Sequence, residues 1–145
     1  MRCCLVLFLL ASPAIADDYF GSILIFDAKH VPATNKVLSQ GRAVVTVLAG
    51  APKKFKLEVT IFKVGVPPGP GTHATNPSTV GPLSPITETT IPGGPAGSVI
   101  KASLPDNPGI YLGAAILEVG HLDAFGQVTG WEEITPMGVQ MVTVP

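Results

Sequence analysis

The sequence predicts an all-β domain, a sandwich of two antiparallel sheets with about seven or eight strands. Apolar residues recur at every second position far more clearly than at helical spacing, and turn-forming residues interrupt these runs at short intervals. After the first sixteen residues, no stretch of a dozen carries an apolar stripe free of proline and glycine. A chain of 145 residues fits one domain of this kind.

The N-terminus has the three parts of a secretory signal peptide. Met1–Arg2 supplies a positive charge, Cys3–Ala11 is a short apolar run, and Ala14–Ala16 has the small-residue pattern of a cleavage site. The apolar run is less than half of the roughly 20 residues that cross a bilayer. We therefore expect residues 1–16 to be removed as a signal peptide. Residues 17–145 would then form a periplasmic or secreted domain without a membrane span.

Composition excludes several classes of function. Both cysteines, Cys3 and Cys4, lie inside the expected signal peptide, so the domain would have no disulfide, thiolate ligand or cysteine nucleophile. The formal net charge is −1, and loss of Arg2 makes it slightly more negative. This balance gives no electrostatic reason to bind nucleic acid or anionic lipid.

The first expected strands are Tyr19–Phe26, Ala43–Leu48 and Phe55–Ile61. The third is the clearest, because its four apolar residues alternate with three polar ones. Successive side chains of a strand point to opposite faces, so we expect this segment to bury one face and expose the other. The preceding Gly50–Lys54 is short enough to be a hairpin turn. Next to it, the basic residues Lys53, Lys54 and Lys56, with Arg42, are expected to form a small cluster that keeps this turn soluble.

Residues 65–97 differ from the rest of the chain, with eight prolines, seven glycines and Glu88 as the only acidic or basic residue. Proline lacks a backbone donor and glycine has excess backbone freedom, so a continuous central strand is not expected here. We predict a long Pro/Gly-rich surface excursion with one edge strand, Ile86–Ile91. Such an excursion is either a binding loop or a mobile crossover.

The next expected strands are Ser98–Leu104 and Ile110–Val119, joined by a segment that includes Asp106–Tyr111. This segment resembles the tyrosine corner of immunoglobulin-like and fibronectin-type-III-like sandwiches. The resemblance covers residues 43–144 and implies that Tyr111 is a structural residue whose hydroxyl bonds backbone a few residues upstream. It concerns architecture only, because Gly113 stands where an antibody-type domain has its second cysteine.

The last expected strands are Gln127–Glu133 and Met137–Val144. Glu132 and Glu133 are adjacent, so they point to opposite faces, cannot form an acid–base pair with each other and are expected to face solvent. Met137, Val139 and Met141 share one face, which we interpret as core filling. Thr143 interrupts this row and indicates a bulge or strand end.

Standard catalytic motifs are absent, including the G-x-S-x-G elbow, H-E-x-x-H, phosphate-binding loops and regular calcium loops. His30, His73 and His121 each lie in a segment expected to be a loop. His73 and His121, with an acidic residue, are the candidate ligands for a metal such as zinc, and methionine with histidine suits copper. The preferred interpretation is that these histidines are solvated loop residues.

We therefore expect an exported, non-enzymatic binding or structural module with no cofactor and an unknown ligand. Its expected contact surfaces are residues 65–97 and the Gly120–Gly126 turn, facing another protein. One alternative is a small metal-dependent protein, for copper or zinc handling or hydrolysis, that uses His73 and His121. The other is a subunit of a surface assembly in which a neighbour completes an exposed edge strand.

Overall fold

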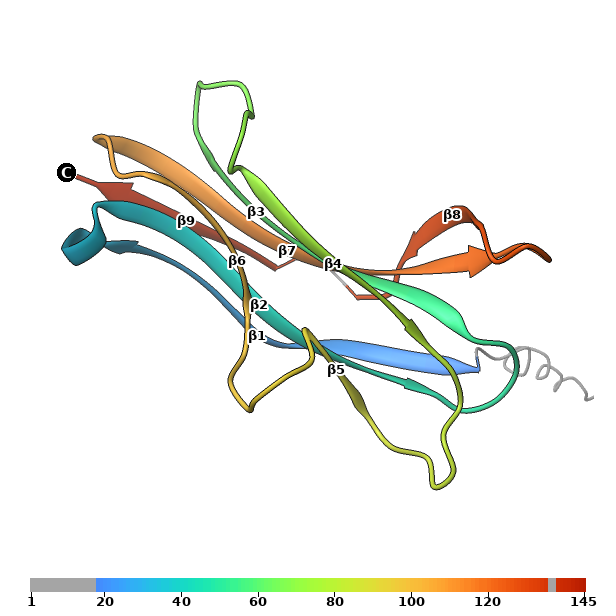
Figure 1. Cartoon of the computed structure of the whole chain (residues 1–145). Helices are drawn as coiled ribbons and strands as arrows, with labels where there is room; N and C mark the ends of the chain where they lie inside the picture. Colours follow the sequence, from blue (N-terminus) through green and yellow to red (C-terminus); the bar gives the residue numbers. More distant parts are fainter. Residues whose placement is uncertain (1–17, 136–137) are drawn as a thin grey trace, which may run out of the picture.

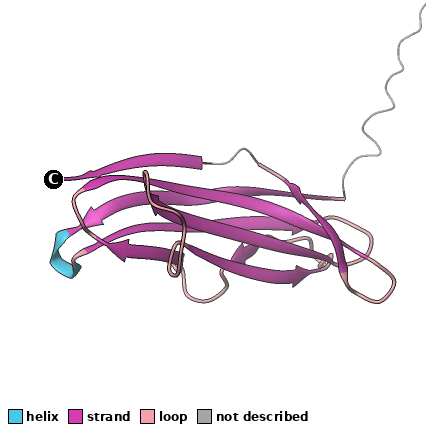
Figure 2. Cartoon of the chain, turned by 90° about the horizontal axis from the view of Figure 1, so that it is seen from above, coloured by secondary structure: helices cyan, strands magenta, loops and turns pink. Residues whose placement is uncertain are grey.

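The computed structural model describes residues 18–135 and 138–145, which form two stacked antiparallel sheets (Figures 1 and 2). The strands are β1 (Tyr19–Val31), β2 (Lys36–Val47), β3 (Lys53–Lys63), β4 (His73–Val80), β5 (Thr89–Ile91), β6 (Ile100–Pro105), β7 (Gly109–Leu122), β8 (Val128–Glu133) and β9 (Gly138–Val144). A single 3-10 turn, η1 (Pro32–Thr34), joins β1 to β2. The expected all-β sandwich is confirmed. The described residues contain no helix long and apolar enough to span a membrane.

Each sheet is built around a long central strand. In sheet A, β1 pairs with one side of β2, and β5 and β6 pair with successive parts of its other side. In sheet B the order is β4-β3-β7, and β8 and β9 pair with successive parts of the free side of β7. In Figure 1, sheet B forms the upper layer and sheet A the lower one.

The core lies between the two sheets and follows the alternation of the strands. Phe55, Leu57, Val59 and Ile61 of β3 are fully buried, which confirms the face predicted for this strand. The ring of Tyr19 meets the ring of Phe55 edge-on, with centroids 5.9 Å apart. An apolar interior of this kind holds together the described residues, none of which is a cysteine.

Gly113 allows the two sheets to approach closely. A Cβ atom at this position would lie 2.6 Å from Cβ of Ala28 on β1 and 3.0 Å from Oγ of Ser39 on β2. Real Cβ atoms do not approach that closely, so any side chain here has to push β7 away from sheet A. The spacing of the two sheets at position 113 therefore admits only glycine.

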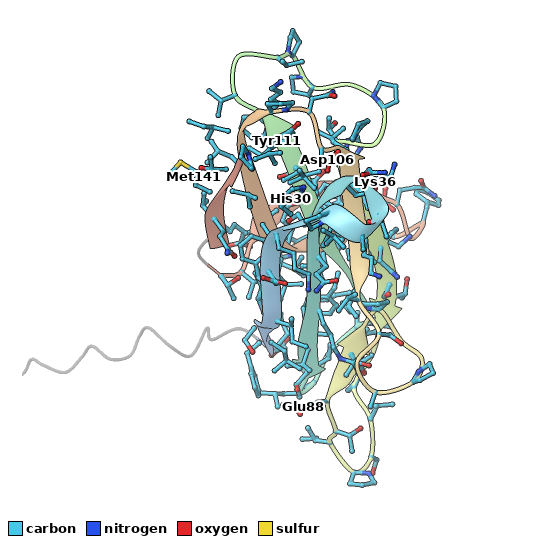
Figure 3. The ribbon with its side chains drawn as sticks, turned by 90° about the vertical axis from the view of Figure 1, so that its left-hand side faces the viewer. His30, Lys36, Glu88, Asp106, Tyr111 and Met141 are labelled. Atoms are coloured by element: carbon cyan, nitrogen blue, oxygen red, sulfur yellow. The ribbon has the colours of Figure 1, made fainter. Side chains whose placement is uncertain are left out.

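The Pro/Gly-rich segment 65–97 is not the single excursion that the sequence predicted. It contains β4, which belongs to sheet B, and β5, which belongs to sheet A and covers only the last half of the expected edge strand. Pro77 fits inside β4 because β4 is an edge strand, paired only with β3 in the described structure. The loop that contains Glu88 lies at the opposite end of the molecule from Tyr111 (Figure 3).

Strands β1 and β2 are longer than predicted. β1 continues past Phe26 to Val31, and the predicted Ala43–Leu48 strand is only the second half of β2. The first half of β2 contains polar residues and a glycine, which hid a central strand from a pattern search. The extension places His30 in β1, while His73 and His121 lie in β4 and β7. The expectation that all three histidines lie in loops was wrong.

Candidate functional site

His30 makes a partly buried pair with Asp106. Its Nε2 atom lies 2.8 Å from Oδ2 of Asp106 and joins the end of β1 to the β6–β7 connection (Figure 3). The backbone N–H of Asp106 also donates to the carbonyl of Asn35, at 3.3 Å. These contacts tie together the connections at one end of the sandwich, so the arrangement around His30 is structural.

His73 and His121, the candidate metal ligands, are not brought together. His73 lies opposite Thr60 on β3, whereas His121 follows Gly120, which lies opposite Lys54 on the same strand. Six residues of extended strand separate these positions by roughly 20 Å. Nε2 of His121 instead lies 3.0 Å from Oε1 of Glu132. Among the described residues, no three histidine, cysteine, aspartate or glutamate side chains gather where they could hold a metal.

Met141 does not fill the core. It is 63% exposed, and Val139 on the same face of β9 is 57% exposed, so the core-filling interpretation of this row was wrong. Figure 3 shows Met141 pointing away from the sandwich. Thr143 was expected to mark a bulge or a strand end. The pairing of β9 with β7 contains no register shift over residues 138–144, and the strand ends one residue after Thr143, at Val144. Met137 lies outside the described residues.

The Tyr111 hydroxyl lies 2.7 Å from the carbonyl oxygen of Asn107 and 3.1 Å from that of Pro105, and it donates toward both. The side chain is 1% exposed. Burial raises the pKa of Tyr111 above its ordinary value, and the nearby Asp106 carboxylate adds to this effect. The hydroxyl therefore keeps its proton at neutral pH and links β7 to the connection that leads back to β6.

Arg42 does not belong to the basic cluster near the β2–β3 turn. It lies in sheet A, is 8% exposed, and donates from Nη1 to the carbonyls of Ser98 and Pro95, at 2.9 and 3.3 Å. Val44 and Thr46, which share its outward face of β2, are also buried. The outer side of sheet A is therefore closed along this part of β2, and the loop between β5 and β6 closes it at Arg42.

The β7–β8 hairpin has a turn fixed by Asp123. Its Oδ1 atom accepts bonds from the backbone N–H groups of Phe125 and Gln127, at 2.8 and 2.9 Å. The turn begins later than the predicted Gly120–Gly126 because β7 continues to Leu122. Phe125 is 88% exposed at the tip of this hairpin.

The outer side of sheet B carries a continuous set of apolar side chains. Directly opposite residues of antiparallel strands point to the same face, so the strand register identifies the members of this set. Besides Ile110 and Trp131 near its two ends, six apolar residues share this outward face, and none of them is buried. We call this set the apolar face: Phe62, Leu112, Ala114, Ile116, Val139 and Met141.

The apolar face has a hollow on its β4 side. The hollow has a volume of about 280 Å³ and is lined by Glu58, Thr60, Phe62, Pro68, Thr72 and His73. Beyond Ile116 the same side of the sheet becomes charged, where Nζ of Lys56 lies 3.1 Å from Oε1 of Glu118. Lys56 also lies over the ring of Trp131, 4.4 Å from its centroid. The charged part of this sheet face thus begins where Glu58 lies opposite Ile116 and continues to Lys56 and Glu118.

The first half of β1 is an exposed apolar edge. Among the described residues β1 pairs only with β2, and Phe20, Leu24 and Ile25 are exposed. Further along β1 the edge is occupied, since the backbone N–H of Ala28 donates to Oε1 of Gln140 on β9, at 3.1 Å. The open stretch of this edge therefore ends before Ala28.

Comparisons with known proteins give no match, whether to a protein-family model, to a curated protein or to a solved structure. Its function is therefore inferred from the geometry of the chain itself.

Sequence reasoning missed the apolar face, although β7 contains a signal for it. The run from Ile110 to Val119 is apolar at both alternating phases, which is typical of a strand covered on both sides. Only the register shows that Leu112, Ala114 and Ile116 point away from the core. Their neighbours Phe62 and Met141 come from distant parts of the sequence.

Proposed function

We propose that this protein is an exported, non-enzymatic binding or structural module of immunoglobulin-like architecture that engages a protein partner through the apolar face. The observation that supports this most strongly is the contrast between dispersed reactive side chains and gathered apolar ones. His30 and His121 each contact a different carboxylate, and His73 lies on another strand from both, whereas six apolar side chains share one outer sheet surface. Gathered, exposed apolar surface marks interaction sites in folded proteins.

The immunoglobulin-like assignment is supported by strand order and by Tyr111. A sheet with β1, β2 and a strand interrupted between β5 and β6 faces a sheet ordered β4-β3-β7, with β8 and β9 following one another along β7. Sandwiches of this class place a tyrosine at the start of the penultimate strand, where its hydroxyl returns to backbone upstream. The bonds of Tyr111 to Asn107 and Pro105 fit that role.

A protein partner fits the apolar face better than a small molecule does. The face is a broad sheet surface, and its hollow of about 280 Å³ is open and no larger than the smallest ordinary ligand pockets. Protein interfaces combine an apolar centre with a polar, charged margin. Here Leu112 and Ala114 lie within the apolar rows, and Lys56 and Glu118 form the margin on one side.

Export is supported by the signal-peptide pattern of residues 1–16, with its charge, short apolar run and A-x-A site. Mass spectrometry of the N-terminus of the protein recovered outside the cytoplasm tests this part of the proposal.

The open edge of β1 supports a second candidate function, a subunit whose edge strand is completed by a neighbour. An added strand would bond the outward backbone groups of residues 20–25 and would cover Phe20, Leu24 and Ile25. The other edges are less suited to this role. Pro77 interrupts the edge of β4, and the edges formed by β5 with β6 and by β8 with β9 are broken.

Site-specific photo-crosslinking in exporting cells tests the proposed function. A photoreactive benzoylphenylalanine is placed at position 139 on the apolar face, at position 24 on the β1 edge, and at exposed position 101 of sheet A as a control. The proposal predicts a discrete crosslinked species from position 139 and none from 101. Crosslinks from position 24 alone would favour edge completion, and equal labelling from all three would refute both candidates.

A further inference from the structure

We propose that the partner of the apolar face is a second copy of this chain, packed face to face around a two-fold axis that runs parallel to β3 and β7. This inference rests on the proposed function, because it names the partner of the same surface. It follows from the positions of the exposed side chains, the hollow and the charged side chains on the outer side of sheet B.

The position of the axis determines which strands meet. An axis between β3 and β7, lying in the interface, places β7 of one copy over β3 of the other and β9 over β4. Because the axis runs along the strands, each cross-strand row faces the same row of the second copy. A two-fold interface has to be self-complementary in this way, and aligned packing is an ordinary arrangement for two sheet faces.

The protruding side chains and the hollow fall in matching rows. Met141 lies in the row of Phe62, and Val139 lies in the row of Thr60 and His73. Met141 and Val139 stand on the β9 side of the face, while Phe62, Thr60 and His73 line the hollow on the β4 side. The two-fold axis therefore sets the exposed side chains of each copy against the hollow of the other.

The centre of the contact is apolar. Leu112 and Ala114 of one copy face Phe62 and Thr60 of the other, in the rows nearest the axis. All four side chains are only partly covered within one chain. Burial of these side chains against each other removes apolar surface from water, which is the main driving force for association.

The charges complement each other under the same operation. Glu118 and its neighbour Glu133 lie on the β7–β8 side of the face, whereas β3 carries Lys54 and Lys56 there, together with Glu58, which the axis sets opposite Ile116. The axis places Glu118 of one copy opposite Lys56 of the other. Opposite charges at the margin set the orientation of two partners and exclude arrangements that bring like charges together.

The available area indicates a weak dimer. The face is four strands wide, at a spacing of about 4.8 Å, and about nine residues long. These dimensions give an area on the order of 600 Å² in each copy. The total of roughly 1,200 Å² is at the lower end of specific interfaces. We therefore expect association at micromolar concentrations or above.

Sedimentation equilibrium of the exported, purified protein tests the inference, over concentrations from about 5 to about 500 µM. We expect a reversible equilibrium between monomer and dimer. Met141→Glu places a negative charge against the hollow of the second copy, which Glu58 lines, and is expected to weaken the dimer by at least about tenfold. Leu48→Glu, at an exposed apolar position next to the end of β2 and outside both candidate surfaces, is the matched control and leaves the equilibrium unchanged. A monomer at every concentration, or a dimer that Leu48→Glu weakens as much as Met141→Glu, would overturn the inference.

A charge exchange provides a second test that does not depend on the apolar residues. Lys56→Glu alone opposes Glu118 of the second copy and weakens the dimer, and Lys56→Glu with Glu118→Lys restores it. Circular dichroism of each variant establishes that the fold is kept. A double variant as weak as the single one would contradict the assigned axis.

Failure of this inference and failure of the proposed function give different results. A monomer whose position 139 crosslinks to a different protein in cells would overturn the second-copy partner and leave the binding surface in place. A monomer without any crosslink from position 139 would overturn both.

Discussion

The outward side chains of the two sheets differ in their exposure to solvent, although both sheets belong to one small sandwich. In sheet A the outward side chains Arg42, Val44 and Thr46 are buried, and carbonyls of the β5–β6 loop bond Arg42. In sheet B the outward side chains Val139 and Met141 are more than half exposed. The chain thus covers the outward face of sheet A from Arg42 to Thr46, although Phe20 of the neighbouring β1 stays exposed, and it leaves an apolar face open on sheet B.

This difference indicates where a partner is expected. A sheet face that its own chain closes has its polar groups satisfied internally and gains little from another protein. An open apolar face keeps unfavourable contact with water, which a partner removes. The predictions that follow test the closed face, the joint between the sheets and the open face, in order of decreasing expected effect on stability.

The close approach of the sheets at Gly113 carries the largest expected effect. Gly113→Val should lower the free energy of unfolding by about 3 kcal/mol, because its side chain overlaps Ala28 and Ser39. Urea denaturation measures the change, and Gly113→Ala should give a smaller loss in the same direction. An unchanged unfolding midpoint for the valine variant would show that the sheets are not packed this closely.

Arg42 tests whether the closed face depends on its loop contacts. Arg42→Met should cost about 2 kcal/mol of stability, since it removes hydrogen bonds from a charged donor to the carbonyls of Ser98 and Pro95. Lys101→Met, at an exposed position on the neighbouring strand β6, is the matched control and should change stability little. Equal losses for the two variants would argue against a covered face.

Tyr111 tests the joint between β6 of sheet A and β7 of sheet B. Tyr111→Phe should lower the free energy of unfolding by about 1 kcal/mol at neutral pH, through loss of the bonds to Asn107 and Pro105. Thermal unfolding of the two proteins gives the difference. A melting temperature identical to that of the unchanged protein would remove Tyr111 from this structural role.

Because the pKa of Tyr111 is raised in the folded state, its contribution to the free energy of unfolding depends on pH. The folded state holds the phenolic proton more tightly than the unfolded state, whose tyrosine ionises near the ordinary value of 10.0. The contribution of Tyr111 is therefore complete below pH 10 and is lost as pH rises through the folded-state pKa. The stability gap between the unchanged protein and Tyr111→Phe should narrow at alkaline pH, and a gap that widens would contradict the assignment.

A substitution on the open face should have the smallest effect on the stability of a single chain. Val139→Thr keeps a branched side chain in β9 and should change the unfolding free energy of the dilute monomer by less than about 0.5 kcal/mol. Its effect is expected on association instead. Destabilisation of the monomer comparable to that of Arg42→Met would show that Val139 is covered within its own chain.

Local patterns in the sequence were sufficient to predict the fold class and the buried face of β3. Phe55–Ile61 alternates strictly, so its inner face was identified without any partner strand. The same reasoning missed β4, because Pro77 argues against a strand unless the strand is known to lie at an edge. It also missed the first half of β2, where Ser39 and Arg42 are buried for tertiary reasons.

The candidate surface was harder to predict because it depends on register. Phe62, Leu112 and Met141 are far apart in the sequence and meet only through the pairing of β3, β7 and β9. For the same reason, sequence spacing could not show that His73 on β4 and His121 on β7 lie beside opposite ends of β3. Non-local pairing, rather than any local signal, decides which side chains gather.

Hydroxyl-radical footprinting of the protein in exporting cells, compared with the dilute purified protein, tests the central claim most directly. It reports the solvent access of Met141 on the open face and of Phe20 on sheet A in one sample. If a partner covers the apolar face, oxidation of Met141 should fall in cells while that of Phe20 stays unchanged. Equal oxidation of Met141 in cells and in dilute solution would contradict a binding role for this face.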